Sequence, residues 1–256
     1  MKILSICTAV LLLSTACGSG ENNLADCEKG SASVPCEEGS AEDRARKALD
    51  AGDPATAVQI LSDLITAEPE VYARYPLLAS AQAAVAGFDI LNVVRAQFSG
   101  GGSVFDLMKN FLPDPATMTT EAYQAALVSM AAAVTTLRSV PESQRVAAAD
   151  AGESWAKSTS FQLTLYQSGY SVMYLNQFTF STTNPGEIDV ARLETMSDAD
   201  AAAILANLAA AASVQQGEQG AAVQSAVASA QASIAAQPGT TDRERLIAYT
   251  RSRQSS

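Results

Sequence analysis

The chain has 256 residues, of which 48% are hydrophobic and 17% charged, and its formal net charge at pH 7 is −11. This composition predicts a globular protein, and the acidic balance without a basic cluster excludes nucleic-acid binding, which needs Lys and Arg to displace counterions from phosphates. The chain contains no histidine, which excludes serine–histidine and cysteine–histidine nucleophiles and histidine-containing metal sites. We therefore predict no catalytic residue, no cofactor and no metal site.

The N-terminus has the pattern of a secretory signal. Met1 and Lys2 precede the apolar run Ile3–Leu13, which is too short to cross a bilayer as a mature helix, so residues 1–16 are predicted to be a signal peptide. The letters "STAC" that follow resemble the lipobox of bacterial lipoproteins, in which cleavage occurs just before a cysteine that carries lipid. This resemblance implies that Cys17 is the first mature residue and the lipid anchor.

The cysteine count bears on an alternative, which is ordinary secretion. Ser14–Ala16 also fits the small-x-small pattern of ordinary signal cleavage, and Ser14 stands where lipoproteins prefer Leu, Val or Ile. Removal of residues 1–16 would then leave Cys17, Cys27 and Cys36, an odd number for an oxidising compartment. Lipidation of Cys17 leaves Cys27 and Cys36 as a pair, which favours the lipoprotein and predicts a small disulfide.

Residues 17–39 are rich in Gly, Ser and acidic side chains and carry almost no large apolar residue. Such a segment cannot form a core and is predicted to be a disordered, flexible tether. Gly18 follows the cysteine. In enterobacterial lipoproteins an Asp at this position implies retention in the inner membrane, and this chain has Gly instead. The resemblance therefore implies an anchor in the outer membrane of a Gram-negative bacterium, on its periplasmic face.

From Ser40 onward the sequence predicts an all-α domain that covers residues 40–253. Several hydroxyl residues are followed three positions later by an acid, a pattern typical of helix N-caps: Ser40–Asp43, Ser139–Glu142, Ser197–Asp200 and Thr241–Glu244. Asp53–Pro54 and Asp114–Pro115 combine a cap with a proline suited to the first turn. Beyond residue 98 we predict helices at about 104–112, 118–139, 142–152, 153–177, 198–216, 220–236 and 241–253.

Residues 48–69 resemble the second half of a tetratricopeptide repeat. Gly52 and Asp53 mark a turn, Ala57 and Leu61 fall on the inner face of a second helix, and Pro69 closes that helix. A second, degenerate unit covers residues 73–98, with Gly87 at its turn. The resemblance implies a helical repeat, and an irregular helical bundle is the alternative fold.

The segment from Trp155 to Phe178 is rich in aromatic residues. Tyr166, Tyr170, Tyr174 and Phe178 recur every four positions, which places them in one stripe along a helix. A second apolar face on the same helix predicts a central position in the fold. Trp155 and this stripe are our candidates for lining a groove that binds a peptide or an apolar ligand; the alternative is that they fill space left by the many alanines.

Taken together, these features predict a non-enzymatic scaffold or binding protein that is anchored to the membrane by lipid and holds an envelope protein on its helical surface. The expectation rests on similarity to tetratricopeptide lipoproteins of Gram-negative bacteria. The alternative is a carrier of a small apolar ligand, similar to the helical-repeat lipoproteins of tripartite periplasmic transporters.

Overall fold

The computed structural model describes residues 39–88, 105, 108, 111–179, 189–214 and 221–254. Every regular element in these ranges is a helix, which confirms the predicted all-α fold. The predicted signal peptide (1–16), the tether up to residue 38, and Cys17, Cys27 and Cys36 lie outside the described residues. None of the described helices is both long enough and apolar enough to cross a membrane.

Beyond residue 117 the helix positions agree closely with those predicted, except that the short helix Val190–Leu193 was not predicted. Two 3₁₀ turns, η1 (Tyr72–Arg74) and η2 (Pro115–Thr117), accompany the α-helices. The α-helices are α2 (Ala41–Asp50), α3 (Pro54–Ala67), α4 (Tyr75–Val85), α7 (Thr120–Arg138), α8 (Glu142–Asp150), α9 (Ser154–Asn176), α10 (Val190–Leu193), α11 (Asp198–Ser213), α12 (Ala221–Ala235) and α13 (Asp242–Gln254). The predicted helix at 104–112 falls largely outside the described residues.

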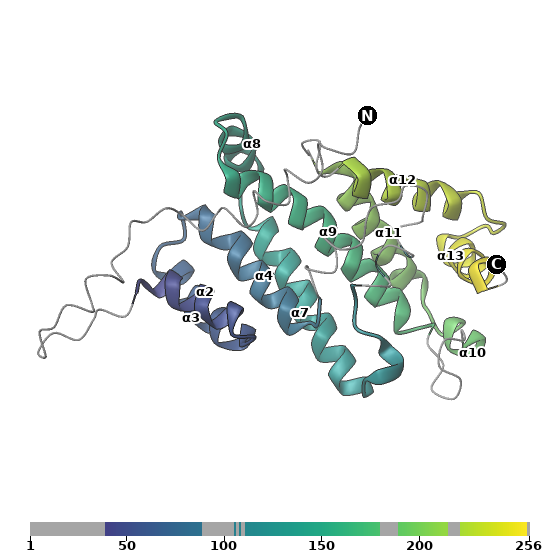
Figure 1. Ribbon diagram of the computed structural model, residues 1–256. Coiled ribbons are helices and arrows are strands. Elements are labelled where there is room, and N and C mark those ends of the chain that lie inside the picture. Colours follow the sequence, from purple (N-terminus) through teal and green to yellow (C-terminus); the bar gives the residue numbers. More distant parts are fainter. Residues whose placement is uncertain are drawn as a thin grey trace, which may run out of the picture.

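The longer helices are arranged in chain order (Figure 1). The α2–α3 pair lies at one end and α13 at the other, with α4, α7, α9 and α11 between them. Among the described long helices, α4 packs on α7, α7 on α9, and α9 on α11, while α13 packs on both α11 and α12. The short α8 packs on α9 and lies outside this row.

Most of the predicted N-caps form. The Ser40 side chain accepts a hydrogen bond from the Asp43 backbone amide at the start of α2, and Asp53 does the same for Thr56 at the start of α3. Thr241 caps α13 through the amide of Glu244. Ser197 and Asp200 form a complete capping box at the start of α11.

Two of the predicted starts are wrong. Ser139 does not cap α8, because α7 continues to Arg138 and Ser139 ends it, with its hydroxyl donating to the Thr136 carbonyl at 2.6 Å. The N-cap of α8 is Pro141, without a side-chain hydrogen bond. Asp114–Pro115 opens only the 3₁₀ turn η2, and Thr119 caps the following helix, α7.

The α2–α3 hairpin has the local features expected of residues 48–69. Gly52 adopts a φ of 76° at the turn, a conformation that side chains disfavour. Ala45, Ala57 and Leu61 are fully buried in a small core that these helices share with α4. Gly87, with a φ of 78°, ends α4 as expected, and the remainder of the predicted second unit, residues 89–98, lies outside the described residues.

The larger core is built around α9, which confirms the predicted central position of this helix. It packs against α4, α7, α8, α11 and α12. Its buried residues include Leu165, Val172 and Met173, but also polar residues such as Gln162 and Gln167. A long helix that is buried nearly all round has to satisfy its polar side chains inside the protein.

Candidate functional site

The five aromatic residues proposed as a groove lining do not form one continuous surface. Trp155, at the start of α9, lies against Tyr72 of η1, with ring centroids 6.1 Å apart. Tyr166 is buried in the larger core, edge-on to Phe88 at 5.4 Å. Burial raises the pKa of Tyr166 to about 12, and its hydroxyl lies 3.4 Å from the Ser80 hydroxyl.

Tyr170, Tyr174 and Phe178 do lie together, as their spacing predicts. Their rings contact in sequence, with centroid distances of 5.7 Å and 6.0 Å, and all three are partly buried against the larger core. The Tyr174 hydroxyl donates to Asp200 Oδ1 at 2.7 Å. This bond to a carboxylate, together with burial, raises the pKa of Tyr174 to about 12. The stripe thus ties α9 to the capping box of α11.

The predicted aromatic residues line neither of two hollows on the described part of the chain, one beside α13 and one beside α8 and α9. Their role in binding a peptide or an apolar ligand therefore stays a prediction. The residues that do line the hollows were not predicted from the sequence to form a site.

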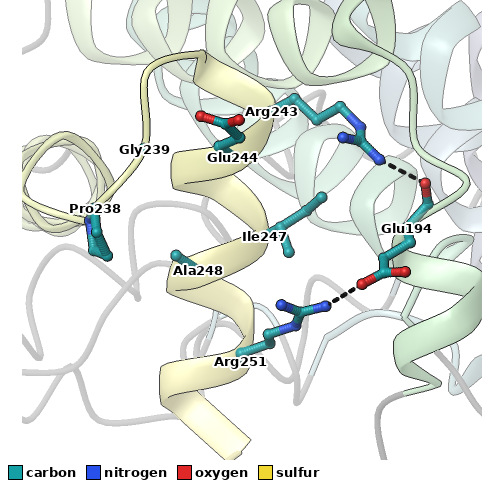
Figure 2. A pocket seen from close by; sticks show the side chains of 8 residues that line it. All are labelled: Glu194, Pro238, Gly239, Arg243, Glu244, Ile247, Ala248 and Arg251. Atoms are coloured by element: carbon teal, nitrogen blue, oxygen red, sulfur yellow. Dashed lines mark hydrogen bonds and ion pairs between the residues drawn. The ribbon is translucent and has the colours of Figure 1, made fainter.

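The larger hollow is a wide, open depression of about 640 Å³ beside α13. Figure 2 shows Arg243 and Arg251 of α13 reaching toward Glu194, at the end of α10. Arg251 pairs with the Glu194 carboxylate at 2.6 Å, while Arg243 donates to the Glu194 and Met196 carbonyls. Both guanidinium groups are therefore engaged in holding α13 against the α10–α11 segment.

The smaller hollow has a volume of about 240 Å³ and lies where α7, α8, α9 and α11 meet. We call it the α8–α9 hollow. Its apolar wall consists of Val140, Leu163, Ala210 and Val214, and its polar groups are Arg138, Glu142, Arg145, Gln167 and Ser213.

Two buried polar side chains distinguish this hollow. Arg145 is only 6% exposed, yet its ion pair with Glu142 spans 3.8 Å, and its guanidinium makes no hydrogen bond to another residue that the structure describes. Gln167 is 2% exposed, and its Oε1 has no hydrogen-bond partner within the same ranges. Burial lowers the pKa of Arg145, and the Glu142 carboxylate opposes that shift only in part.

Such groups are unusual, because burying a charge or an amide costs free energy unless hydrogen bonds replace those made with water. Sequence reasoning missed both residues. One signal was present for Gln167, a polar residue on a helix predicted to be apolar on two faces. Arg145 gave none, since an arginine on a short, Ala-rich helix ordinarily faces solvent.

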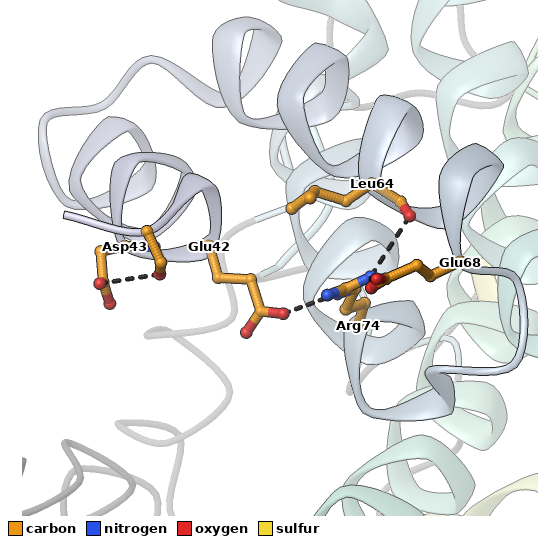
Figure 3. A network of polar contacts seen from close by, with 6 residues as sticks. Glu42, Asp43, Leu64, Glu68 and Arg74 are labelled. Atoms are coloured by element: carbon orange, nitrogen blue, oxygen red, sulfur yellow. Dashed lines mark hydrogen bonds and ion pairs between the residues drawn. The ribbon is translucent and has the colours of Figure 1, made fainter. Parts of the chain in front are cut away.

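A separate polar network joins the α2–α3 pair to η1 (Figure 3). Arg74 pairs with Glu42 of α2 and with Glu68 at the end of α3, each at 2.6 Å, and donates to the Leu64 carbonyl at 3.3 Å. Every polar contact of this arginine connects helix ends. The arrangement is that of a structural clamp.

No family model, curated protein sequence or solved structure gives a significant match to this chain. The described residues therefore define the protein by its fold class, which is an all-α domain with longer helices packed in chain order.

Proposed function

We propose that this protein is a non-enzymatic scaffold, anchored by a lipid on Cys17 to the periplasmic face of the outer membrane, which holds an envelope protein on its helical surface. The anchor is supported by the apolar run followed by "STAC", and by the pairing of the other two mature cysteines, Cys27 and Cys36, that lipidation leaves. Two or more acyl chains make membrane residence effectively permanent, because each buried CH₂ contributes about 0.8 kcal/mol.

The observation that carries the binding role is the order of helix packing. From α2 to α12 the longer described helices pack mainly on their nearest described neighbours along the chain, which is how helical-repeat proteins build extended surfaces for partners. Isolated large apolar side chains are exposed on two helices of this row, α4 (Val85) and α7 (Val128), and on the short α10 (Val190). An extended row of helices with scattered, exposed apolar side chains suits a partner protein better than a small ligand.

The anchor is tested by Cys17→Ser, with Cys27→Ser as the matched control. We expect the Cys17 variant to leave the membrane fraction for the soluble periplasmic fraction, and the Cys27 variant to stay with the membrane. A Cys17→Ser chain that remains membrane-bound would refute lipidation at this residue.

The partner is tested by photo-crosslinking groups placed one at a time at Val85, Val128 and Val190 in cells. We expect positions along one part of the row to capture the same protein reproducibly, with the remaining positions as internal controls. Capture of no reproducible protein at any position argues against the scaffold. Native mass spectrometry that finds a co-purified apolar molecule would favour the carrier instead.

A further inference from the structure

The α8–α9 hollow contains a buried cation that lacks an adequate partner. The Arg145 guanidinium is buried between α8 and its neighbours, and the Glu142 carboxylate lies 3.8 Å away, on a side chain that is 69% exposed. An exposed carboxylate at that distance compensates little of the cost of burying the guanidinium. The site is therefore electrostatically incomplete, and an anion would complete it.

Gln167 provides a second, independent indication from another helix. Its side chain lines the same hollow from α9, is almost fully buried and leaves Oε1 without a partner. The carboxamide Nε2 is a donor that can bind an anion in the hollow, whereas Oε1 is an acceptor, which an ionised carboxylate cannot satisfy. Arg138 at the rim bonds Asn207 at 3.2 Å and adds a second positive charge.

The size and the walls of the hollow limit what such an anion can be. About 240 Å³ corresponds to roughly eight water molecules at about 30 Å³ each, which is below the volume of typical drug-sized sites. Leu163, Val140 and Val214 make one wall apolar. A phosphate ion would leave this wall without a partner, whereas a carboxylate with a short hydrocarbon tail would match both halves.

We propose that the α8–α9 hollow binds a short-chain carboxylic acid in its ionised form, with the carboxylate accepting from the Arg145 guanidinium and the Gln167 Nε2, and with the hydrocarbon tail against Leu163 and Val214. Planar guanidinium and carboxylate groups form charge-assisted hydrogen bonds that are stronger than neutral ones. This inference goes beyond the proposed scaffold role, because it concerns a small ligand, and its test does not depend on any partner protein.

The probe is butyrate, titrated into the purified full-length chain and followed by saturation-transfer NMR. A ligand of about six non-hydrogen atoms is expected to bind with a dissociation constant of about 1 mM. Butyramide has the same shape without the charge and should bind at least about tenfold more weakly, since hydrogen bonds to charged groups are the stronger class. Inorganic phosphate is the competing anion.

Three variants locate the effect. Arg145→Met should weaken butyrate binding about tenfold or more, and Gln167→Leu should weaken it severalfold, whereas Arg46→Met, which alters an exposed arginine of α2, should leave it unchanged. Thermal melts report whether each variant folds, and Arg145→Lys, which keeps the charge but loses the planar fork, replaces Arg145→Met if the latter does not fold.

Several results would overturn the proposal. No saturable butyrate signal, equal binding of butyrate and butyramide, or unchanged binding in the Arg145 variant would each do so. Phosphate binding more tightly than butyrate would assign the hollow to a different anion. None of these results bears on the Cys17 fractionation or the crosslinking, so failure here is distinguishable from failure of the scaffold proposal.

Discussion

The pair Ser197 and Ser139 offers the sharpest test of how this sequence begins its helices. Both residues stand three positions before an acid, so the sequence pattern predicts an N-cap at each of them. In the structure Ser197 accepts from the Asp200 amide at 3.1 Å and donates to Asp200 Oδ2 at 2.6 Å, while that same oxygen accepts from the Ser197 amide at 2.9 Å. The Ser139 hydroxyl makes one bond, to a carbonyl of the helix that Ser139 ends.

The expected magnitudes follow from these contacts. Ser197→Ala removes the acceptor for one unpaired amide of α11 and one partner of Asp200, and loss of an N-cap costs about 1 kcal/mol and up to about 2. Ser139→Ala removes an exposed hydroxyl from a helix C-terminus and should change the free energy of unfolding by less than about 0.5 kcal/mol. Since about 1 kcal/mol shifts Tm by about 2–4 °C in a domain of this size, the two variants are separable.

The assay is thermal and urea unfolding of both variants followed by far-ultraviolet circular dichroism, with Ser197→Thr as the conservative control. Ser197→Thr should retain most of the wild-type stability, because threonine also caps helices. Equal losses for the two alanine variants, or a larger loss for Ser139→Ala, would refute the assignment of caps drawn from the structure.

Three further outcomes are expected. The bond to Asp200 and burial raise the pKa of Tyr174 to about 12, so this tyrosine should ionise late in an absorbance titration. Because the bond and burial stabilise the neutral form, their contribution to folding stability is complete below pH 10 and is lost as the pH rises toward 12, and Tyr174→Phe should abolish this pH dependence. Leu61→Ala, at a fully buried position, should cost about 2–5 kcal/mol in urea unfolding, against almost nothing for Val128→Ala at an exposed one. Gly239→Ala should lower Tm, because the residue has a φ of 150° and an added β-carbon would lie 2.8 Å from a side-chain carbon of α13; an unchanged Tm would show that the loop adapts.

Local chemistry explains which parts of the fold were predictable. Asp53 with Pro54, and Gly52 before them, prescribe a turn and a helix start that need nothing from the rest of the protein, and both formed where expected. The all-α class follows for the same reason, since helical spacing and caps recur along the chain. The prediction for Ser139 was wrong because two helices meet in that segment. Ser139 ends α7, whereas the pattern assigned it to the start of α8.

The α8–α9 hollow depends on information that local patterns do not contain. Arg145 and Gln167 lie on different helices, both of which the sequence places correctly, yet neither helix pattern says which faces meet. The aromatic stripe shows the same limit. The spacing of Tyr170, Tyr174 and Phe178 correctly places their rings in contact, but the packing of α9 between other helices decides whether such a stripe lines a groove or contacts its neighbours.

The polar residues of α9 differ in how their hydrogen bonds are satisfied. The hydroxyls of Thr159, Ser168 and Ser171 each donate to the carbonyl four residues earlier, at 2.7 Å to 2.8 Å, so the helix itself satisfies them. A glutamine reaches beyond its own helix and needs a partner elsewhere. Gln162 donates through Nε2 to a serine of α4 at 3.1 Å, but its Oε1, like that of Gln167, has no hydrogen-bond partner among the described residues. Gln167 lines the α8–α9 hollow together with the buried Arg145, and a carboxylate bound there would accept hydrogen bonds from the Arg145 guanidinium and from the Gln167 Nε2.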